Sequence, residues 1–357
     1  MSTDTAAANH WTVLRVCRER IALRLPVPAM FWLVVVLVLL LTVIGLSLTI
    51  GSQATTLDEV WRTLAGENIS KVITNVVWEF RFPRALAAAL VGAMFALSGA
   101  ALQHVTRNGL ADPSLVGVSQ GAGLAVVALT VLWPNLVGQY RPWVAFGGSM
   151  LVAVLIQGLT HTSRGASSVR FILMGVGVAA MISATTSVLM TYGDIERVLS
   201  VMTWLNGSIN AANWDDVRML ALWSAVLLPA MLVLSRATAA LRMGEATAIG
   251  LGAPVRWLRY GLITIAVGFA AIGTAVVGPL GFVGLIAPHA ARRLAPSGVA
   301  LHLLLTAALG AILVCLADLM GRSIIAPIQI PAGLVTDLIG VPVFLILLRR
   351  ATRRTAP

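Results

Sequence analysis

Residues with the chemistry to bind a metal or to form a disulfide are few in this sequence and widely spaced. The two cysteines, Cys17 and Cys315, allow neither a disulfide framework nor a zinc cluster. The histidines match no metal-ligand spacing; they are His10, His104, His161, His289 and His302. We therefore predict no catalytic residue, no bound cofactor and no metal site.

Nucleotide chemistry of the P-loop type would need the pattern Gly-x-x-x-x-Gly-Lys followed by Ser or Thr, so that backbone amides and one ammonium hold the phosphates. Lys71 is the sole lysine; Val72 follows it, and the required glycines do not precede it. The sequence therefore predicts a chain that is not an ATPase of this type. Any energy for active work has to come from elsewhere.

Ionisable residues inside the apolar segments are also scarce, with Asp318 and Asp337 as the main cases. A carrier driven by protons or sodium usually places such groups near the bilayer centre. Asp318 has a simpler role available, because Arg322 follows it by one helical turn and the two can pair. The sequence favours this pairing over ion coupling.

Membrane helices are the elements that must position these residues. Of the 357 residues, 58% are hydrophobic and 11% are charged, which is too apolar for a soluble globular protein. Many apolar runs approach the ~20 residues that cross a bilayer. We predict ten segments, at 31–50, 85–105, 115–133, 143–160, 171–192, 217–235, 257–277, 279–294, 299–319 and 333–348. The eighth follows Pro279, and we expect it to begin as a broken or partly re-entrant helix.

These segments predict an all-α, polytopic membrane protein. It has a cytoplasmic N-terminal segment (1–30), a transmembrane domain (31–350) and a cytoplasmic tail (351–357). Ten crossings place both termini on one side, and arginines gather in the connections of that side, which the positive-inside rule makes cytoplasmic. The net charge of +11 is spread between apolar runs rather than along one face, which argues against nucleic-acid binding.

Two long connections on the opposite side, 51–84 and 193–216, predict interfacial helices along the outer leaflet. They carry four tryptophans, and aromatic anchoring at the interface is the favoured interpretation, with a docking surface for another protein as the alternative; the four are Trp61, Trp78, Trp204 and Trp214. The second and seventh segments also resemble each other weakly. Because they would run in opposite directions, they suggest an inverted repeat, which is common in transporters.

Small residues are dense in several segments, where they allow close helix packing. The fifth segment, 171–192, adds uncharged hydroxyls and is the predicted lining of a passage for a polar cargo. Its candidate residues are Gly175, Gly177, Ser183 and Thr186. The longest cytoplasmic connection holds residues 242–252, where a short helix followed by a glycine turn could plug into a nucleotide-binding subunit. An amphipathic linker is the alternative for this segment.

Four blocks of sequence identify a family resemblance. They are Arg81-Phe82-Pro83-Arg84; Arg107 to Pro113 with Gly117 to Ala122; Glu245 to Gly252; and Gly278 to His289 with Arg292. In these blocks the chain resembles the FecCD/BtuC-like permeases of binding-protein-dependent ABC importers, which carry ferric siderophores, vitamin B12 and haem. The resemblance extends from about the first helix to the C-terminus.

The resemblance implies a type II importer permease in the cell (inner or plasma) membrane. Such a permease pairs with a second copy or a related chain, with ABC ATPase subunits on the cytoplasmic face and with an external solute-binding protein. It implies that Glu245, Ala246, Gly250 and Gly252 belong to the ATPase-coupling helix. It further implies that Arg81, Arg84 and Arg322 pair with acidic groups of the binding protein, and that the fifth helix lines the pathway.

Two residues depart from the family pattern: Gly109 stands where proline is common, and Asp337 stands where a small uncharged residue is expected. Iron-siderophore or similar metal-chelate transport is the favoured function. An ion-coupled secondary transporter and a non-transporting membrane receptor or scaffold are the alternatives.

Overall fold

The structure is a computed structural model that describes residues 11–16, 21–51, 55–67, 69–106, 108–160, 168–242, 245–250, 254–326 and 328–355. Its long helices follow the predicted apolar segments. They are α1 (Val27–Thr49), α4 (Phe82–Thr106), α5 (Val118–Leu132), α6 (Val137–Thr160), α7 (Ser168–Tyr192), α9 (Trp214–Arg242), α11 (Val255–Val277), α12 (Val283–Leu294), α13 (Val299–Ser323) and α14 (Ala332–Thr355).

Short elements connect these helices. They are the strands β1 (Trp11–Val16) and β2 (Ile21–Pro26), the helices α2 (Leu57–Leu64), α3 (Lys71–Asn75), α8 (Ile195–Leu205) and α10 (Glu245–Gly250), a π-helical turn η1 (Val76–Arg81), and the 3-10 turns η2 (Pro113–Val116) and η3 (Pro134–Leu136). The two strands form an antiparallel hairpin before α1. The sequence did not predict this hairpin, because its strands are short and lie outside the apolar segments.

Eight helical spans are long and apolar enough to cross a membrane, one of them formed by α3, η1 and α4 together. The shorter helices α5 and α12 occupy the predicted third and eighth segments. The all-α, polytopic architecture is therefore confirmed, with eight full-length spans and two shorter helices in the described part of the chain.

The predicted break at the eighth segment is confirmed as well. The helix α11 ends at Val277, and the chain turns through Gly278 at φ 82° and Phe282 at φ 63° before α12 begins at Val283. Left-handed backbone at Gly278 is readily adopted only by glycine. The following helix is thus only 12 residues long and starts later than the predicted residue 279.

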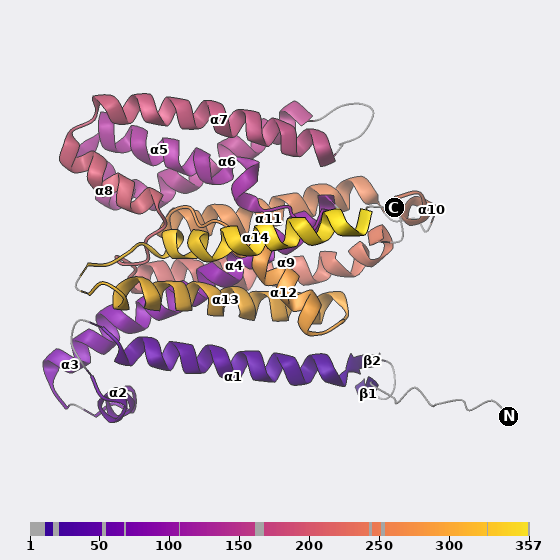
Figure 1. Cartoon of the computed structure of the whole chain (residues 1–357), viewed down its shortest axis with the longest axis horizontal. Helices are drawn as coiled ribbons and strands as arrows, with labels where there is room; N and C mark the ends of the chain where they lie inside the picture. The colour runs from indigo at the N-terminus through magenta and orange to yellow at the C-terminus, as the bar shows by residue number, and fades with distance from the viewer. Residues whose placement is uncertain are drawn as a thin grey trace.

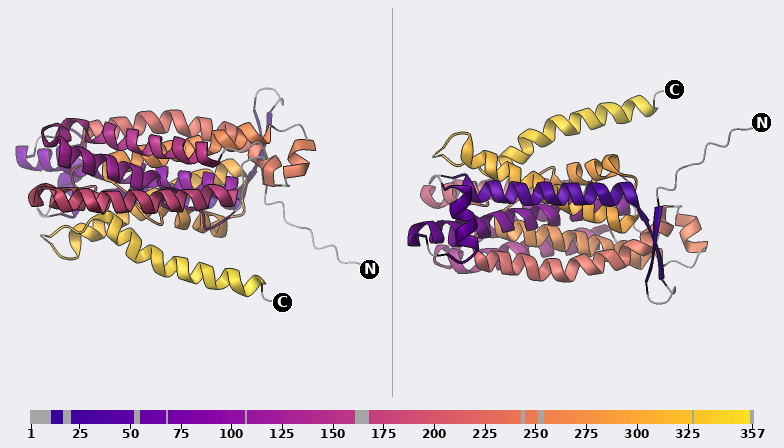
Figure 2. Two further views of the ribbon diagram at one scale, coloured as in Figure 1. Left: turned by 90° about the horizontal axis from the view of Figure 1, so that it is seen from above. Right: turned by 90° about the horizontal axis from the view of Figure 1, so that it is seen from below.

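Figure 1 shows the long helices lying side by side, with β1, α10 and the end of α14 at one end of the bundle and α2, α3 and α8 at the other. Both views in Figure 2 show α14 diverging from the bundle toward its C-terminal end. Large apolar side chains on α14 are consequently exposed, including Leu338 at 76%. Lipid or another protein has to cover such a face.

The short helices at the far end only partly match the predicted interfacial role. Trp61 on α2 is 74% exposed, as an aromatic anchor requires, and Thr56 closes a capping box with Glu59. The hydrogen bond from the Thr56 N–H lowers the pKa of Glu59. Trp204 on α8 is instead buried to 5% exposure, so the prediction of interfacial anchoring is wrong for this residue. It faces the protein because α8 folds back over α5.

Helix α4 lies at the centre of the packing. It is antiparallel to α11, since Ser98 donates to the Ala266 carbonyl at 2.6 Å while the Phe95 ring lies against Gly273, further along α11. The two helices that the sequence relates as repeats therefore run in opposite directions. On its other sides α4 packs with almost no space for side chains: Gly92 meets Gly310 of α13, and Gly99 meets Gly284 of α12.

Gly99→Ala tests this close packing. A methyl group at residue 99 would overlap the Gly284 backbone, and overpacking of this kind costs about 1–3 kcal/mol. We expect a lower thermal unfolding midpoint of the purified protein in detergent. Gly45→Ala on α1 is the matched control, because a Cβ there meets nothing within 4 Å. Equal midpoints for the two variants would contradict the close α4–α12 contact.

Candidate functional site

The predicted docking arginines gather at the end of the bundle that carries α2, α3 and α8. We call Arg81, Arg84, Arg322 and Asp318 the arginine cluster. Arg84 donates two hydrogen bonds to Oδ1 of the Asp318 carboxylate, from Nε at 3.0 Å and from Nη2 at 2.8 Å. Arg322 lies one turn after Asp318, with its Nε 3.6 Å from Oδ2. The predicted Asp318–Arg322 pairing is confirmed, and Arg84 joins it from α4.

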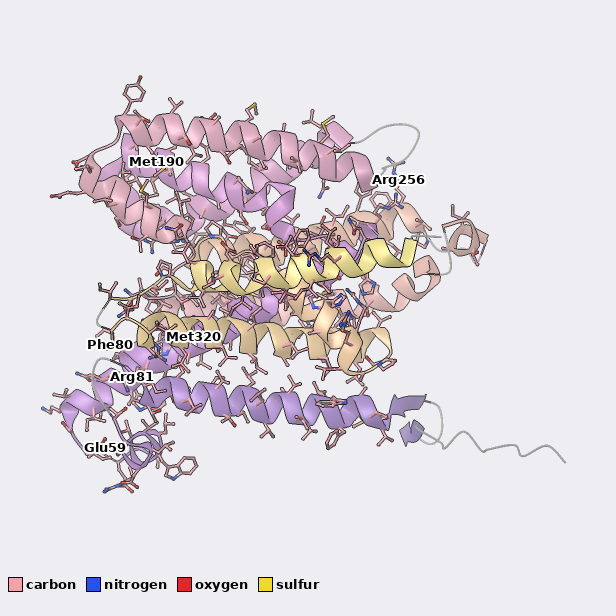
Figure 3. The ribbon with its side chains drawn as sticks, in the orientation of Figure 1. Glu59, Phe80, Arg81, Met190, Arg256 and Met320 are labelled. Atoms are coloured by element: carbon pink, nitrogen blue, oxygen red, sulfur yellow. The ribbon has the colours of Figure 1, made fainter. Side chains whose placement is uncertain are left out.

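The remaining donors of the cluster bind the carbonyl groups at the C-terminal end of α1. Arg322 donates to the Ile50 and Ser47 carbonyls, each at 2.6 Å, and Arg81 donates to the Leu48 carbonyl at 2.7 Å. The last carbonyls of a helix lack intrahelical partners, and positive charge is favoured there. Figure 3 shows Arg81 at this end of the molecule. The cluster therefore ties α1, α4 and α13 together.

Of the three arginines, Arg84 reaches furthest toward the surface. Its Nη1 donates to Asn210 Oδ1 and to Gln329 Oε1, both at 2.9 Å. These residues belong to the α8–α9 and α13–α14 connections, so Arg84 links both loops to the cluster. The side chains of Arg84 and Arg322 are only 13% and 6% exposed. The family-implied docking role stays a prediction for all three arginines.

The predicted pathway helix α7 lies at the edge of the single chain (Figure 1). Ser183 and Gly177 are exposed and Thr186 is half-buried, whereas Gly175 is buried and its carbonyl faces Gly117. The four predicted residues therefore do not share one face. Several hydroxyls of α7 donate to the carbonyls four residues earlier, as Thr186 does to Ile182 at 2.9 Å and Ser187 does to Ser183 at 3.0 Å. Their remaining hydrogen-bonding capacity points outward along an uncovered helix.

The predicted coupling segment forms the short helix α10 at the end of the bundle that also carries β1 (Figure 1). Ala248 is buried against Val255, while Ile249 is 61% exposed. A Cβ at Gly250 would meet nothing within 4 Å. Glu245 and Ala246 open this helix, and Gly252 lies outside the described residues. The segment is thus anchored on one side and open on the other.

An internal polar network around α12 was not predicted. Gln103 of α4 donates to the Gly284 carbonyl at 3.1 Å and accepts from Arg292 Nη2 at 2.7 Å, so it joins both ends of α12. Asp112 lies over the start of α12, beside Gly284. Burial raises the pKa of the Asp112 carboxyl, and hydrogen bonds from Ser114 oppose this rise. The buried polar residue types were visible in the sequence, but their convergence on α12 was not.

The two departures from the family pattern both lie near α12. The Arg292 guanidinium is the group closest to Gly109, and it is 3.9 Å from where a Cβ would be. Asp337 of α14 is half-buried, and its Oδ1 has no hydrogen-bond partner and lies against Gly281. A side chain at residue 281 would displace this carboxylate from its present position.

Comparison with known proteins confirms the family resemblance. Residues 37–350 match the FecCD transport family. The chain is 36% identical to the Fe(3+)-citrate import system permease protein YfmE of Bacillus subtilis, covering 92% of this chain and 97% of that protein. It is also 36% identical to the achromobactin transport system permease protein CbrC of Dickeya dadantii, over 87% of this chain and 89% of that one.

One solved structure shares both fold and sequence. It is an inward-facing conformation described as a metal-chelate type ABC transporter, and it superposes with a TM-score of 0.75 at 29% identity. The alignment covers 89% of this chain and 98% of that chain.

Asp318→Asn tests the arginine cluster. The change leaves two buried guanidinium groups without their carboxylate, and breaking a buried ion pair costs about 3–5 kcal/mol. We expect a clearly lower unfolding midpoint in detergent. Asp215→Asn is the matched control, because Asp215 pairs with Arg218 at 2.9 Å on the surface, where such pairs contribute little. An unchanged midpoint for Asp318→Asn would show that the cluster does not hold the helix ends.

Proposed function

Because the chain belongs to the FecCD transport family, we propose that it is the membrane-spanning permease subunit of an ABC importer that carries an iron chelate across the cell membrane. The observation that carries this proposal is the match over residues 37–350, together with relatives named for ferric citrate and achromobactin transport. ATP hydrolysis belongs to a separate subunit in this family. Both termini are proposed to be cytoplasmic, since β1 and the end of α14 lie at the same end of the bundle as α10, the proposed ATPase contact (Figure 1).

The uncovered helices support pairing with a second permease, either a copy of this chain or a related one. Helix α7 and helix α14 both expose large apolar side chains, among them Leu173 at 66% and Leu338. The face of α7 also carries Ser183 and Thr186, and lipid is a poor partner for exposed hydroxyls. Two chains facing each other across α7 would enclose a passage with hydroxyl groups, which suits a polar chelate.

Coupling to the ATPase is proposed at α10. The next helix, α11, extends to the far end of the bundle, where its Val277 carbonyl accepts a hydrogen bond from Ser208 N at 2.8 Å. Ser208 belongs to the α8–α9 connection. This connection is also hydrogen-bonded to the start of α14, since Gly333 N donates to the Gly207 carbonyl at 2.9 Å. Closure of the ATPase subunits would displace α10, and packed contacts would carry this movement to the far ends of α8 and α14.

The rival mechanism of ion coupling loses Asp318, one of its two candidate residues. Asp318 is 3% exposed and held by both Arg84 and Arg322. A coupling carboxylate has to exchange its ion or proton during transport. A carboxylate fixed between two guanidinium groups is poorly suited to that exchange.

Uptake into proteoliposomes tests the function. We expect the permease pair, reconstituted with its ATPase subunits and binding protein, to accumulate radioactive ferric citrate or a ferric siderophore only when ATP is present. Vesicles that contain this chain alone should accumulate none. Accumulation by the chain alone under an ion gradient would overturn the proposal.

Gly250→Trp tests the coupling segment in the same vesicles. A large side chain on the open face of α10 should block seating of the ATPase, so uptake should fall by at least about tenfold, equivalent to ~1.4 kcal/mol. Gly298→Trp is the control, because Gly298 is another exposed glycine with nothing near its Cβ position. Normal uptake by Gly250→Trp would rule out α10 as the coupling element.

Docking of the binding protein is proposed at the arginine cluster, where three guanidinium groups face one carboxylate and leave an excess of positive charge. Arg84→Gln should weaken docking in nanodiscs, and added salt should weaken docking of the unmodified protein. Asp318→Asn is the informative control: it breaks the same ion pair but makes the cluster more positive, so docking should persist or tighten. Equal losses of docking in both variants would show that the cluster only stabilises the fold and does not bind the partner.

A further inference from the structure

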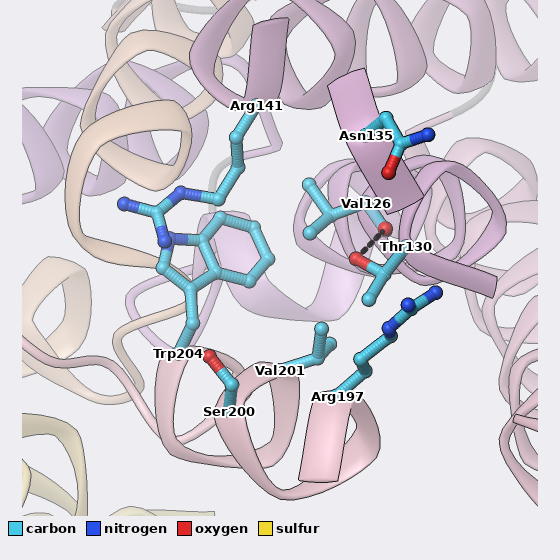
Figure 4. Close-up of a pocket in the computed structure, with 8 residues that line it drawn as sticks. All are labelled: Val126, Thr130, Asn135, Arg141, Arg197, Ser200, Val201 and Trp204. Carbon is cyan, nitrogen blue, oxygen red and sulfur yellow. Dashed lines mark hydrogen bonds between the residues drawn. The ribbon is translucent and has the colours of Figure 1, made fainter. Parts of the chain in front are cut away.

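A cavity of about 180 Å³ lies between α5, η3, α6 and α8, at the end of the bundle opposite α10. Its inner wall is formed by Trp204 and Thr130, which are 5% and 4% exposed. Asn135, Arg197 and Ser200 are exposed and form its mouth. Figure 4 shows the Arg141 guanidinium beside the Trp204 indole, on the side of the cavity opposite Asn135 and Arg197. The cavity therefore has a buried wall and an open mouth.

The lining is rich in hydrogen-bond donors and positive charge. It contains two guanidinium groups, one amide, two hydroxyls and one indole N–H, and none of its eight described lining residues carries a carboxylate. Guanidinium groups are suited to carboxylate and phosphate groups because their N–H donors match the spacing of two oxygens. The lining therefore matches a negatively charged ligand better than a neutral or positive one.

The buried donor Trp204 Nε1 has no hydrogen-bond partner. Buried indole N–H groups usually find an acceptor, because an unmade hydrogen bond in the interior is costly. Trp204 lines the cavity, and in Figure 4 its indole nitrogen lies beside the Arg141 guanidinium. An acceptor atom inside the cavity would satisfy it.

Each of the two arginines has only a weak interaction with a nearby carboxylate. Arg141 forms no hydrogen bond or ion pair with the described residues, and the Asp216 carboxylate attracts it only through space. Arg197 has one long contact, 3.8 Å from Asp194, between side chains that are both about half exposed. This contrasts with the arginine cluster, where each guanidinium is bonded to oxygen atoms of the chain itself.

We propose that this cavity binds a small oxyanion, a carboxylate or phosphate group, at Arg141 and Trp204 Nε1, with Arg197 supplying positive charge at the mouth. Two sources offer this chemistry: a soluble carboxylate or phosphate, and the phosphate of an anionic lipid headgroup, which an opening beside the interfacial helix α8 could admit. The site is separate from α7, α10 and the arginine cluster. It does not depend on the proposed transport function.

The first test is the thermal unfolding of the full chain in detergent with increasing citrate or inorganic phosphate, against sodium chloride at matched ionic strength. A soluble ligand should raise the midpoint saturably by about 2–4 °C. Arg141→Gln should abolish this rise, and Trp204→Phe, which keeps the ring but removes the N–H, should raise the half-saturating concentration about fivefold. Arg218→Gln is the control and should behave like the unmodified chain, because Arg218 is exposed and does not line the cavity.

The second test distinguishes the lipid source. The chain is purified from nanodiscs that contain phosphatidylglycerol or only phosphatidylcholine, and bound lipid is counted by native mass spectrometry. Retention of phosphatidylglycerol that is lost in Arg141→Gln and in Arg197→Gln, but not in Arg218→Gln, assigns the cavity to a headgroup. A saturable citrate or phosphate response with no retained lipid assigns it to a soluble anion. Absence of both in the unmodified chain overturns the proposal, whatever the outcome of the uptake experiments.

Discussion

Close contact between helix backbones is the constraint on which the rest of this structure depends. Lipid surrounds a membrane bundle, so burying apolar side chains gains little, and van der Waals packing has to hold the helices together. Helix α4 meets this requirement through Gly92 against Gly310 and Gly99 against Gly284. These contacts leave α13, α12 and α11 arranged around one central helix, and every other element is placed relative to that core.

Few charged residues lie within this helix framework, and the arginine cluster is at one end of the bundle. The arginine cluster binds the open carbonyls of α1 and holds Asp318, so that residues of an expected docking surface are also internal connectors. A partner that approached this end would meet the positive field of the cluster rather than three free side chains. At the opposite end α10 is fixed through Ala248, while Thr247, Ile249 and Gly250 are exposed.

The helix proposed to line the transport pathway, α7, is not enclosed by the rest of the single chain. Its best-packed helices, α4 and α11, form a solid interior, while the helix with the hydroxyl groups lies at the edge and α14 leans away (Figures 1 and 2). This arrangement supports the proposed pairing with a second permease. The described interior itself contains no metal-binding group of three or more His, Cys, Asp or Glu residues.

Much of this could be predicted from the sequence, because the length of apolar runs, the break at Pro279 and the four family blocks are local properties of the chain. The i,i+4 spacing also predicted the Asp318–Arg322 pair. Sequence spacing could not show that Arg84 joins that pair from 234 residues away, that Trp204 turns inward, or that Gly175 and Gly177 face opposite ways. Those facts depend on how helices distant in the chain pack against one another, and only the tertiary structure decides that.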